Sequence, residues 1–253
     1  MKKQLSTAVS VVAAVGVYAS AYSDAMKAAE KELKAKKYKV AVTSFVAAAD
    51  VADKPDEKAK AFFLAGECMY RRGDFAKASK YYKLMLDVKD SGPYYEGLAK
   101  MRIGQCLYKQ RKYAEAIPAL EKAVAVKGAR ADHVSDSRMH IGYCQYYTKK
   151  YDAALITFDK VIADPKAPAG HRSYARVFRG LAKKALKKYD EAIAELKQVV
   201  EEQEQEQEQE QEQEQEQEQE QEQEEKTKRP SPAKRARVEP ASASPTESII
   251  VDD

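Results

Sequence analysis

Histidine and cysteine side chains carry much of the catalytic and metal-binding chemistry of proteins, and the chain contains three of each. His133, His140 and His171 show no HExxH motif and no other paired-ligand spacing. The sequence also has no glycine-rich phosphate loop and no nucleophile elbow. Since no catalytic constellation is present, we expect a protein that is not an enzyme and that has no metal ion or cofactor.

The three cysteines are spaced too regularly for a disulfide. Cys68, Cys106 and Cys144 follow one another at intervals of 38 residues. Equivalent residues of stacked helical units lie on the order of 10 Å apart, which is beyond the reach of a disulfide bond. We therefore expect each cysteine to be a small, buried packing residue.

Other residue types share this spacing. Three sets recur in one register, at intervals of 37 or 38 residues: Gly66, Gly104, Gly142 and Gly180; Tyr38, Phe75, Tyr113, Tyr151 and Tyr189; and Ala41, Ala78, Ala116, Ala154 and Ala192. Such self-similarity is the signature of a repeat architecture.

One repeat shows what the period encodes. Residues 138–147 place apolar side chains at helical spacing, with Gly142 where a second helix must approach closely. A polar turn at 148–150 leads to a second helix, in which Ala154 and Phe158 share one face at positions i and i+4. The pattern predicts a pair of antiparallel helices in every repeat.

These features resemble the tetratricopeptide repeat. The glycine of the first helix, the turn Arg72-Gly73-Asp74-Phe75, the small alanine of the second helix and the large residue four positions later match that family. The period of 38 residues exceeds the family's period of about 34. The first and last repeats also depart from the pattern, since Ala29 replaces the glycine and Lys184 replaces a tyrosine, as expected of capping repeats.

The resemblance implies an all-α fold: a right-handed α-solenoid of about five antiparallel helix hairpins, followed by a low-complexity and disordered tail. We expect a signal peptide at 1–21, a repeat domain at 22–200, a Glu/Gln repeat at 201–225 and a disordered basic tail with Ser-Pro pairs at 226–253. The five repeats are expected at about 25–55, 59–92, 97–130, 135–168 and 173–201.

In that family the first helices line a concave groove, and the resemblance implies a site for a peptide or protein there. In register, the residues expected on this face are Glu67, Tyr70, Arg71, Arg102, Gln105, Tyr108, Lys109, His140, Tyr143, Tyr146 and Tyr147. Tyrosine offers flat contact area at low entropy cost, and Arg or Lys binds carboxylates, so we expect an acidic peptide as the ligand. The alternative is that Tyr70, Tyr108 and Tyr146 only pack helices together.

The first 21 residues read as a secretory leader. Lys2 and Lys3 precede a short apolar run at 8–17, and Ala19-Ser20-Ala21 supplies small residues for cleavage. We expect cleavage near Ala21, export to the periplasm or beyond, and no stable membrane span afterwards; an uncleaved anchor is the alternative.

The net charge of +4 divides unevenly along the chain. Residues 201–253 hold fourteen Glu in the low-complexity run, then six basic and four acidic residues, so they carry −12 and residues 1–200 carry +16. A basic body indicates acidic partners, or it reflects lysines that only solubilise helix surfaces. For the Glu/Gln run we expect a helix that frays into disorder, because Glu faces Glu at i,i+4.

The last segment disagrees with the leader. Lys234, Arg235 and Arg237 form a core typical of nuclear localisation or phosphate contacts, and Ile249-Ile250-Val251-Asp252-Asp253 resembles a SUMO-interacting motif. Either the leader is an anchor, or these motifs are accidental, or two unrelated segments have been joined.

The repeats lead to the functional prediction: an exported, non-enzymatic scaffold that binds proteins or peptides, with nucleic acid not expected as a ligand of the repeat body. The alternative prediction is a nuclear or nucleic-acid-associated adaptor that uses the basic tail. The sequence does not determine the partner or the oligomeric state.

Overall fold

The computed structural model describes residues 21–228, and every regular element in that range is an α-helix. The predicted leader, apart from Ala21, and the predicted tail motif Lys234, Arg235 and Arg237 lie outside the described residues. The SUMO-like motif at 249–253 lies outside them as well.

The helices follow one another as hairpins. Residues 21–34 are helical, and the later elements are α2 (Tyr38–Asp50), α3 (Pro55–Arg71), α4 (Phe75–Leu86), α5 (Gly92–Lys109), α6 (Tyr113–Val124), α7 (Ala131–Tyr147), α8 (Tyr151–Ile162), α9 (Ala169–Ala185) and α10 (Tyr189–Lys228). Short turns join residues 21–34 to α2, α3 to α4, α5 to α6, α7 to α8, and α9 to α10. The predicted all-α solenoid of helix hairpins is confirmed.

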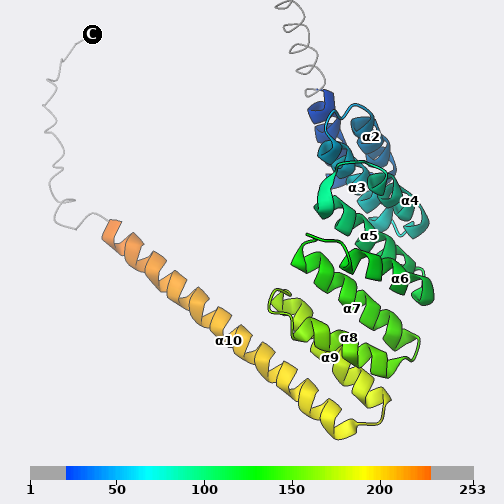
Figure 1. Ribbon diagram of the computed structural model, residues 1–253. Coiled ribbons are helices and arrows are strands. Elements are labelled where there is room, and N and C mark those ends of the chain that lie inside the picture. Colours follow the sequence, from blue (N-terminus) through cyan, green and yellow to red (C-terminus); the bar gives the residue numbers. More distant parts are fainter. Residues whose placement is uncertain (1–20, 229–253) are drawn as a thin grey trace, which may run out of the picture. The chain divides into compact units, whose positions relative to one another are not determined.

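Two rows of helices build the repeat body, which is the compact unit ending at Val199 (Figure 1). The first helices α3, α5, α7 and α9 form one row, and the second helices α4, α6 and α8 form the other. Helix α5 packs against both α3 and α7, and α7 also packs against α9, whereas the second helices contact one another little. The more crowded first helices therefore form the inner, concave row of the stack.

In the four hairpins from α3 onward the two helices touch at a glycine, at a contact that we call the seam. Gly142 of α7 lies so close to Phe158 of α8 that a Cβ atom on Gly142 would overlap the phenyl ring. The same contact joins Gly66 to Tyr82, Gly104 to Leu120, and Gly180 to Leu196. The prediction that glycine permits the close approach of the second helix is confirmed.

The cysteines lie inside this packing. Cys68, Cys106 and Cys144 are fully buried, with free thiols. Burial raises the pKa of the Cys68 thiol to about 11 and the pKa values of the other two to about 12. The thiols are therefore protonated at neutral pH, and the predicted role as small buried packing residues is confirmed.

Each hairpin turn has the same backbone geometry. Between α7 and α8, the Lys149 amide donates to the Tyr146 carbonyl at 2.9 Å and the Lys150 amide donates to the Gln145 carbonyl at 2.8 Å. Lys149 has a φ of 61°. This pair of bonds with a left-handed residue is the Schellman motif, which ends one helix and releases the chain into the next.

The Glu/Gln run remains helical in the described residues. The last helix, α10, continues to Lys228, and its residues from Val200 onward belong to a second compact unit. Glu and Gln are good helix formers, and the exposed carboxylates repel one another only weakly through water. The expected fraying of this run into disorder stays a prediction. None of the helices in residues 21–228 is long and apolar enough to cross a membrane.

Candidate functional site

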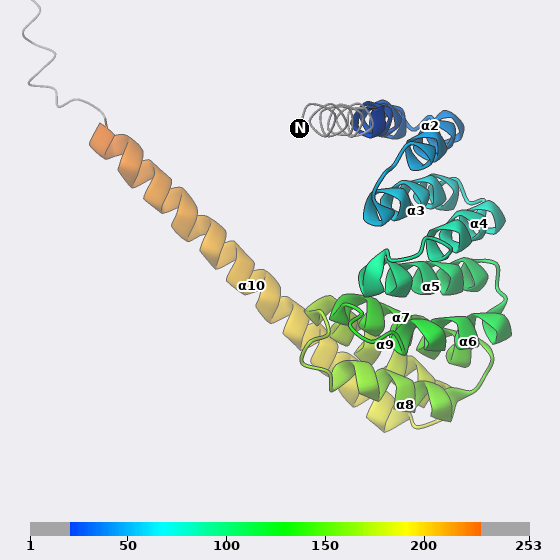
Figure 2. The ribbon, with the colours of Figure 1, turned by 45° about the horizontal axis from the view of Figure 1, so that its top comes forward.

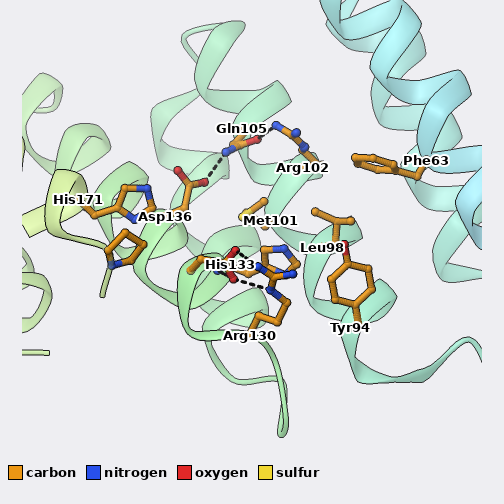
Figure 3. Close-up of a pocket in the computed structure, with 12 residues that line it drawn as sticks. Phe63, Tyr94, Leu98, Met101, Arg102, Gln105, Arg130, His133, Asp136 and His171 are labelled. Atoms are coloured by element: carbon orange, nitrogen blue, oxygen red, sulfur yellow. Dashed lines mark hydrogen bonds and ion pairs between the residues drawn. The ribbon is translucent and has the colours of Figure 1, made fainter. Parts of the chain in front are cut away.

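A cavity of about 540 Å³ opens on the inner row of the repeat body, between α3, α5, α7 and the start of α9 (Figure 3). We call it the pocket. Its lining residues are Phe63, Tyr94, Leu98, Met101, Arg102, Gln105, Arg130, Asp132, His133, Asp136, Pro168 and His171. Since four first helices contribute, the pocket exists only when the repeats are stacked.

Charged groups along one wall of the pocket hold one another in place. The Arg102 Nε atom lies 3.1 Å from the Glu67 Oε1 atom, and Arg102 Nη1 donates to Gln105 Oε1 at 2.8 Å. Gln105 Nε2 in turn donates to Asp136 Oδ2 (Figure 3). Glu67 also accepts a hydrogen bond of 2.5 Å from the buried hydroxyl of Tyr82. This network links three consecutive repeats.

Aromatic rings cover the same arginine. The Arg102 guanidinium lies 5.7 Å from the ring centres of both Phe63 and Tyr70, within range of cation–π attraction. Burial raises the pKa of the Tyr70 hydroxyl to about 12. Arg102 is therefore a fixed cation of the wall.

Asp136 is the carboxylate at the end of this network. Burial alone would raise its pKa, but the hydrogen bond and charge of His140, with the charges of His171 and Arg102, hold it below its usual range. The His140 Nδ1 atom lies 3.5 Å from Asp136 Oδ2. Asp136 thus remains ionised at neutral pH and faces several donors at once.

His133 is the least satisfied polar group of the pocket. The residue is only 9 % exposed, and its Nδ1 atom has no hydrogen-bond partner among the described residues. Burial lowers its pKa, and the charges of Asp132 and Asp136, which oppose this change, do not cancel it. The ring is therefore neutral at pH 7. It lies 5.3 Å from the ring of Tyr94.

The mouth of the pocket is more exposed. Arg130 donates to both carboxylate oxygens of Asp132, at 3.0 and 2.7 Å, and its side chain is 60 % exposed. The Arg130 guanidinium lies 5.8 Å from the ring centre of Tyr94. Across the mouth, His171 Nδ1 lies 2.9 Å from the Ser135 hydroxyl.

The predicted tyrosines gather elsewhere, in a cluster near the hairpin turns. Tyr108 lies within 6.2 Å of the rings of Tyr143 and Tyr147, and Tyr147 stacks on Tyr113 at 5.2 Å. Tyr146 contacts Tyr147 and Phe178. These contacts pack neighbouring repeats together, although Tyr147 itself is 47 % exposed.

The structure therefore divides the predicted site residues into three groups. Arg102 and Gln105 line the pocket, and Glu67 and Tyr70 contact Arg102. Tyr108, His140, Tyr143, Tyr146 and Tyr147 form the tyrosine cluster. Arg71 is exposed at the end of α3, outside both. Lys109 is exposed at the end of α5, and its Nζ atom lies 6.0 Å from the ring centre of Tyr108 at the border of the cluster.

Sequence reasoning missed most of the pocket. Tyr94, Arg130, Asp132, His133, Asp136 and His171 were not predicted as site residues. One signal was available, because His133 and His171 are 38 residues apart and thus occupy the same position in successive repeats.

Comparison with protein families identifies the class. Tetratricopeptide repeat models match residues 26–96, 88–134 and 101–168, and a second tetratricopeptide repeat model matches residues 173–206. Together these matches cover most of the chain, so the protein belongs to the tetratricopeptide repeat family. This fold is typically an interaction scaffold without catalytic activity.

Solved structures show the same fold in distant sequences. BtubC from P. vanneervenii matches with a TM-score of 0.62 and 13% identity over 94% of this chain and 97% of its own. MamA from Desulfovibrio magneticus RS-1 matches with a TM-score of 0.57 and 18% identity, over 72% of this chain and 94% of its own. YrrB, described as a TPR protein with an unusual peptide-binding site, matches with a TM-score of 0.52 and 18% identity. The match covers 70% of this chain and 84% of YrrB. No curated protein matches the chain significantly.

The chemistry available at the pocket is that of binding. It combines an apolar surface, fixed charges and a buried imidazole. Within residues 21–228, no group of three or more His, Cys, Asp or Glu side chains is arranged to hold a metal ion.

Proposed function

We propose that this chain is an exported, non-enzymatic scaffold that holds a peptide segment of a partner protein in the pocket. The observation that carries the proposal is the pocket itself, because a cavity shared by four first helices is how a solenoid engages an extended ligand. Membership of the tetratricopeptide repeat family supports it, and so does the peptide-binding site for which YrrB is described.

The lining suggests how a peptide would be held. Phe63, Leu98 and Met101 offer an apolar surface for one side chain of the ligand. His171, which is half-buried in the lining, carries polar atoms beside it that can bond to the peptide backbone.

Arg130 would make the pocket prefer a ligand that carries a carboxylate. Its guanidinium is largely exposed and already holds a carboxylate, that of Asp132, through two donors. A ligand carboxylate can replace or join Asp132 in the same bidentate geometry. The proposed ligand therefore carries an acidic residue next to an apolar one.

Affinity capture with the tagged full chain tests the proposal. A variant with Tyr94→Ala and Arg130→Ala should lose the captured partner, because both side chains shape the mouth of the pocket. A matched variant with Ile156→Ala and Lys160→Ala, both exposed on α8 of the outer row, should retain it. Equal recovery with both variants would refute binding in the pocket.

The tyrosine cluster gives the test a second arm. If a variant with Tyr108→Ala and Lys109→Ala loses the partner while the Tyr94 and Arg130 variant keeps it, the binding surface lies at the cluster instead. A melting curve of each variant separates loss of the surface from loss of the fold, since Tyr108 also packs between repeats.

Export is proposed from the leader alone, and the nuclear alternative from Lys234, Arg235 and Arg237. Fractionation of source cells with N-terminal sequencing decides between them. A chain that begins near Tyr22 in an extracytoplasmic fraction supports export. An unprocessed chain in a nuclear fraction supports the alternative.

A further inference from the structure

Each hairpin turn of the repeat body carries a pair of basic residues. The pairs are Lys36-Lys37, Arg71-Arg72, Arg111-Lys112, Lys149-Lys150 and Lys187-Lys188. All ten residues are exposed, and none of their side chains forms an ion pair with another of the described residues. We call this set the basic edge.

These turns lie on one side of the stack. The first helices all run in the same direction, so their carboxyl ends meet at one edge, seen at the right of Figure 2 for the turns that follow α3 and α5. The loops at the opposite edge mix both signs of charge, as in Asp53-Lys54 and Lys89-Asp90. At the opposite edge only the loop at 125–130 has two cations, Lys127 and Arg130, and Arg130 is paired with Asp132. The turns are therefore the places where unpaired positive charge recurs in every repeat.

In four of the pairs, the first residue has a backbone conformation that is unfavourable for lysine or arginine. Lys36, Arg111, Lys149 and Lys187 have φ values of 58°, 59°, 61° and 64°. This left-handed conformation strains a residue that has a Cβ atom, and glycine is the usual choice for it. Each of these positions therefore has a basic residue where glycine would be more stable.

The second residue of these pairs is also unfavourable. Lys37, Lys112 and Lys150 are the N-cap residues of α2, α6 and α8, and none of them makes a side-chain capping bond. An acidic or hydroxyl side chain would accept a bond from the exposed amides, whereas a lysine faces the positive end of the helix dipole.

The second repeat shows the locally preferred solution in the same geometry. Gly73 takes the left-handed position with a φ of 81°, and Asp74 caps α4 by accepting from the Lys77 amide at 3.2 Å. The basic pair of that repeat moves to the preceding residues, Arg71 and Arg72. Every turn thus keeps two cations even where their positions differ, which indicates a role for the charge beyond folding.

We propose that the basic edge docks the repeat body onto the surface of an anionic lipid bilayer. Lysine and arginine near such a surface each add to the attraction. Tyr147 and Tyr189 are 47 % and 55 % exposed beside these turns, and tyrosine favours the boundary between water and lipid. The inference rests on the proposed export, which brings the chain to membranes and keeps it from nucleic acids.

A lipid surface also suits the arrangement of the charges. Pairs in successive repeats are separated by about 10 Å, the packing distance of helices, and the stacked turns follow a curve. A fluid bilayer moves its anionic lipids to wherever the cations lie, whereas a nucleic acid presents phosphates at fixed spacing. A bilayer can therefore supply anionic groups to each pair at whatever spacing the turns have.

Vesicle co-sedimentation of the full chain at low salt is the test. The chain should bind vesicles of phosphatidylcholine with phosphatidylglycerol, and it should bind weakly to phosphatidylcholine alone, which measures any contribution of the leader. A variant with Lys149→Gly and Lys150→Asp copies the turn of the second repeat. Its affinity for anionic vesicles should fall at least about tenfold. Its melting temperature should stay the same or rise.

A charge-matched variant isolates the edge. Lys89→Gly with Lys127→Asp changes the net charge equally at the opposite edge, where both lysines are exposed, and it should bind vesicles like the parent chain. Equal binding by the two variants would overturn the proposal. So would tighter binding to a DNA duplex than to anionic vesicles, lost in the Lys149 and Lys150 variant. Because the pocket is unchanged in these variants, partner capture tests the proposed scaffold function separately.

Discussion

The seam and the pocket are built on the same first helices, but only the seam is repeated. A glycine meets a large side chain in α3, α5, α7 and α9 alike. In the pocket, by contrast, the positions equivalent to Arg102 are held by Leu64, His140 and Phe178. The repeated contact is filled and buried, and the unrepeated residues leave a cavity.

This difference separates two tasks within one helix. The seam joins the two helices of a hairpin, so it recurs in the four hairpins that follow the first, capping repeat. The pocket needs to exist once, and its polar groups are joined across repeats by the chain of Glu67, Arg102, Gln105 and Asp136. Substitutions in the seam should therefore change stability most, and substitutions in the pocket should change binding most.

Removal of the large seam residue should have the largest effect. Phe158→Ala opens a cavity at a fully buried site, and the free energy of unfolding should fall by about 3–5 kcal/mol in urea denaturation. Ile156→Ala on the same helix, where the side chain is 59 % exposed, should change it by less than about 0.5 kcal/mol. A loss below 1 kcal/mol for Phe158→Ala would show that the seam is not what holds the hairpin.

Loss of the central cation of the pocket should have an intermediate effect. Arg102→Ala removes the cation that pairs with Glu67 and the donor to the Gln105 side-chain oxygen, so the free energy of unfolding should fall by about 2 kcal/mol. The exposed pair of Arg130 and Asp132 is the control, and Arg130→Ala should cost less than about 1 kcal/mol. If the two variants were equally stable, the wall of the pocket would be as loosely held as its mouth.

The effect of substituting the seam glycine on stability should depend on the large residue that it contacts. Gly142→Ala places a Cβ atom against the ring of Phe158 and should destabilise the parent chain by about 1–2 kcal/mol, the cost of overpacking less the gain in helix propensity. In the Phe158→Ala background the ring is absent, so the same change should stabilise the fold by about 0.5–1 kcal/mol. Equal effects in both backgrounds would contradict a direct contact.

The same difference explains what could be predicted from the sequence. Gly142, Ala154 and Phe158 recur in register, so their spacing alone predicted the hairpin and its closest contact. Arg102 and Gln105, which line the pocket, lie near the repeated Gly104, so the register placed them among the expected groove residues.

The rest of the pocket depends on how successive first helices cross. Helix α7 begins at Ala131, seven residues before the stretch on which the helical pattern was recognised, so His133 and Asp136 were overlooked. The tyrosines had the composition of a binding surface, yet their rings pack mainly against one another. The repeat spacing predicts that the helices stack. It does not predict the distance between the first turns of successive first helices, and that distance determines the size of the cavity.

Dependence on pH should give the smallest difference between the two regions. Burial lowers the pKa of His133 below the ordinary value of 6.5, so the folded state binds its proton less readily than the unfolded state does. Stability should then decline as the pH falls below the unfolded value, and urea unfolding should show a lower midpoint at about pH 5 than at about pH 7. In His133→Gln this decline should shrink. Phe158 and Gly142 do not titrate, so Phe158→Ala should lose the same free energy at both pH values. Titration of the His133 ring by NMR provides the direct check, and a pKa at or above 6.5 would mean that the ring is solvated and the pocket is wider in solution.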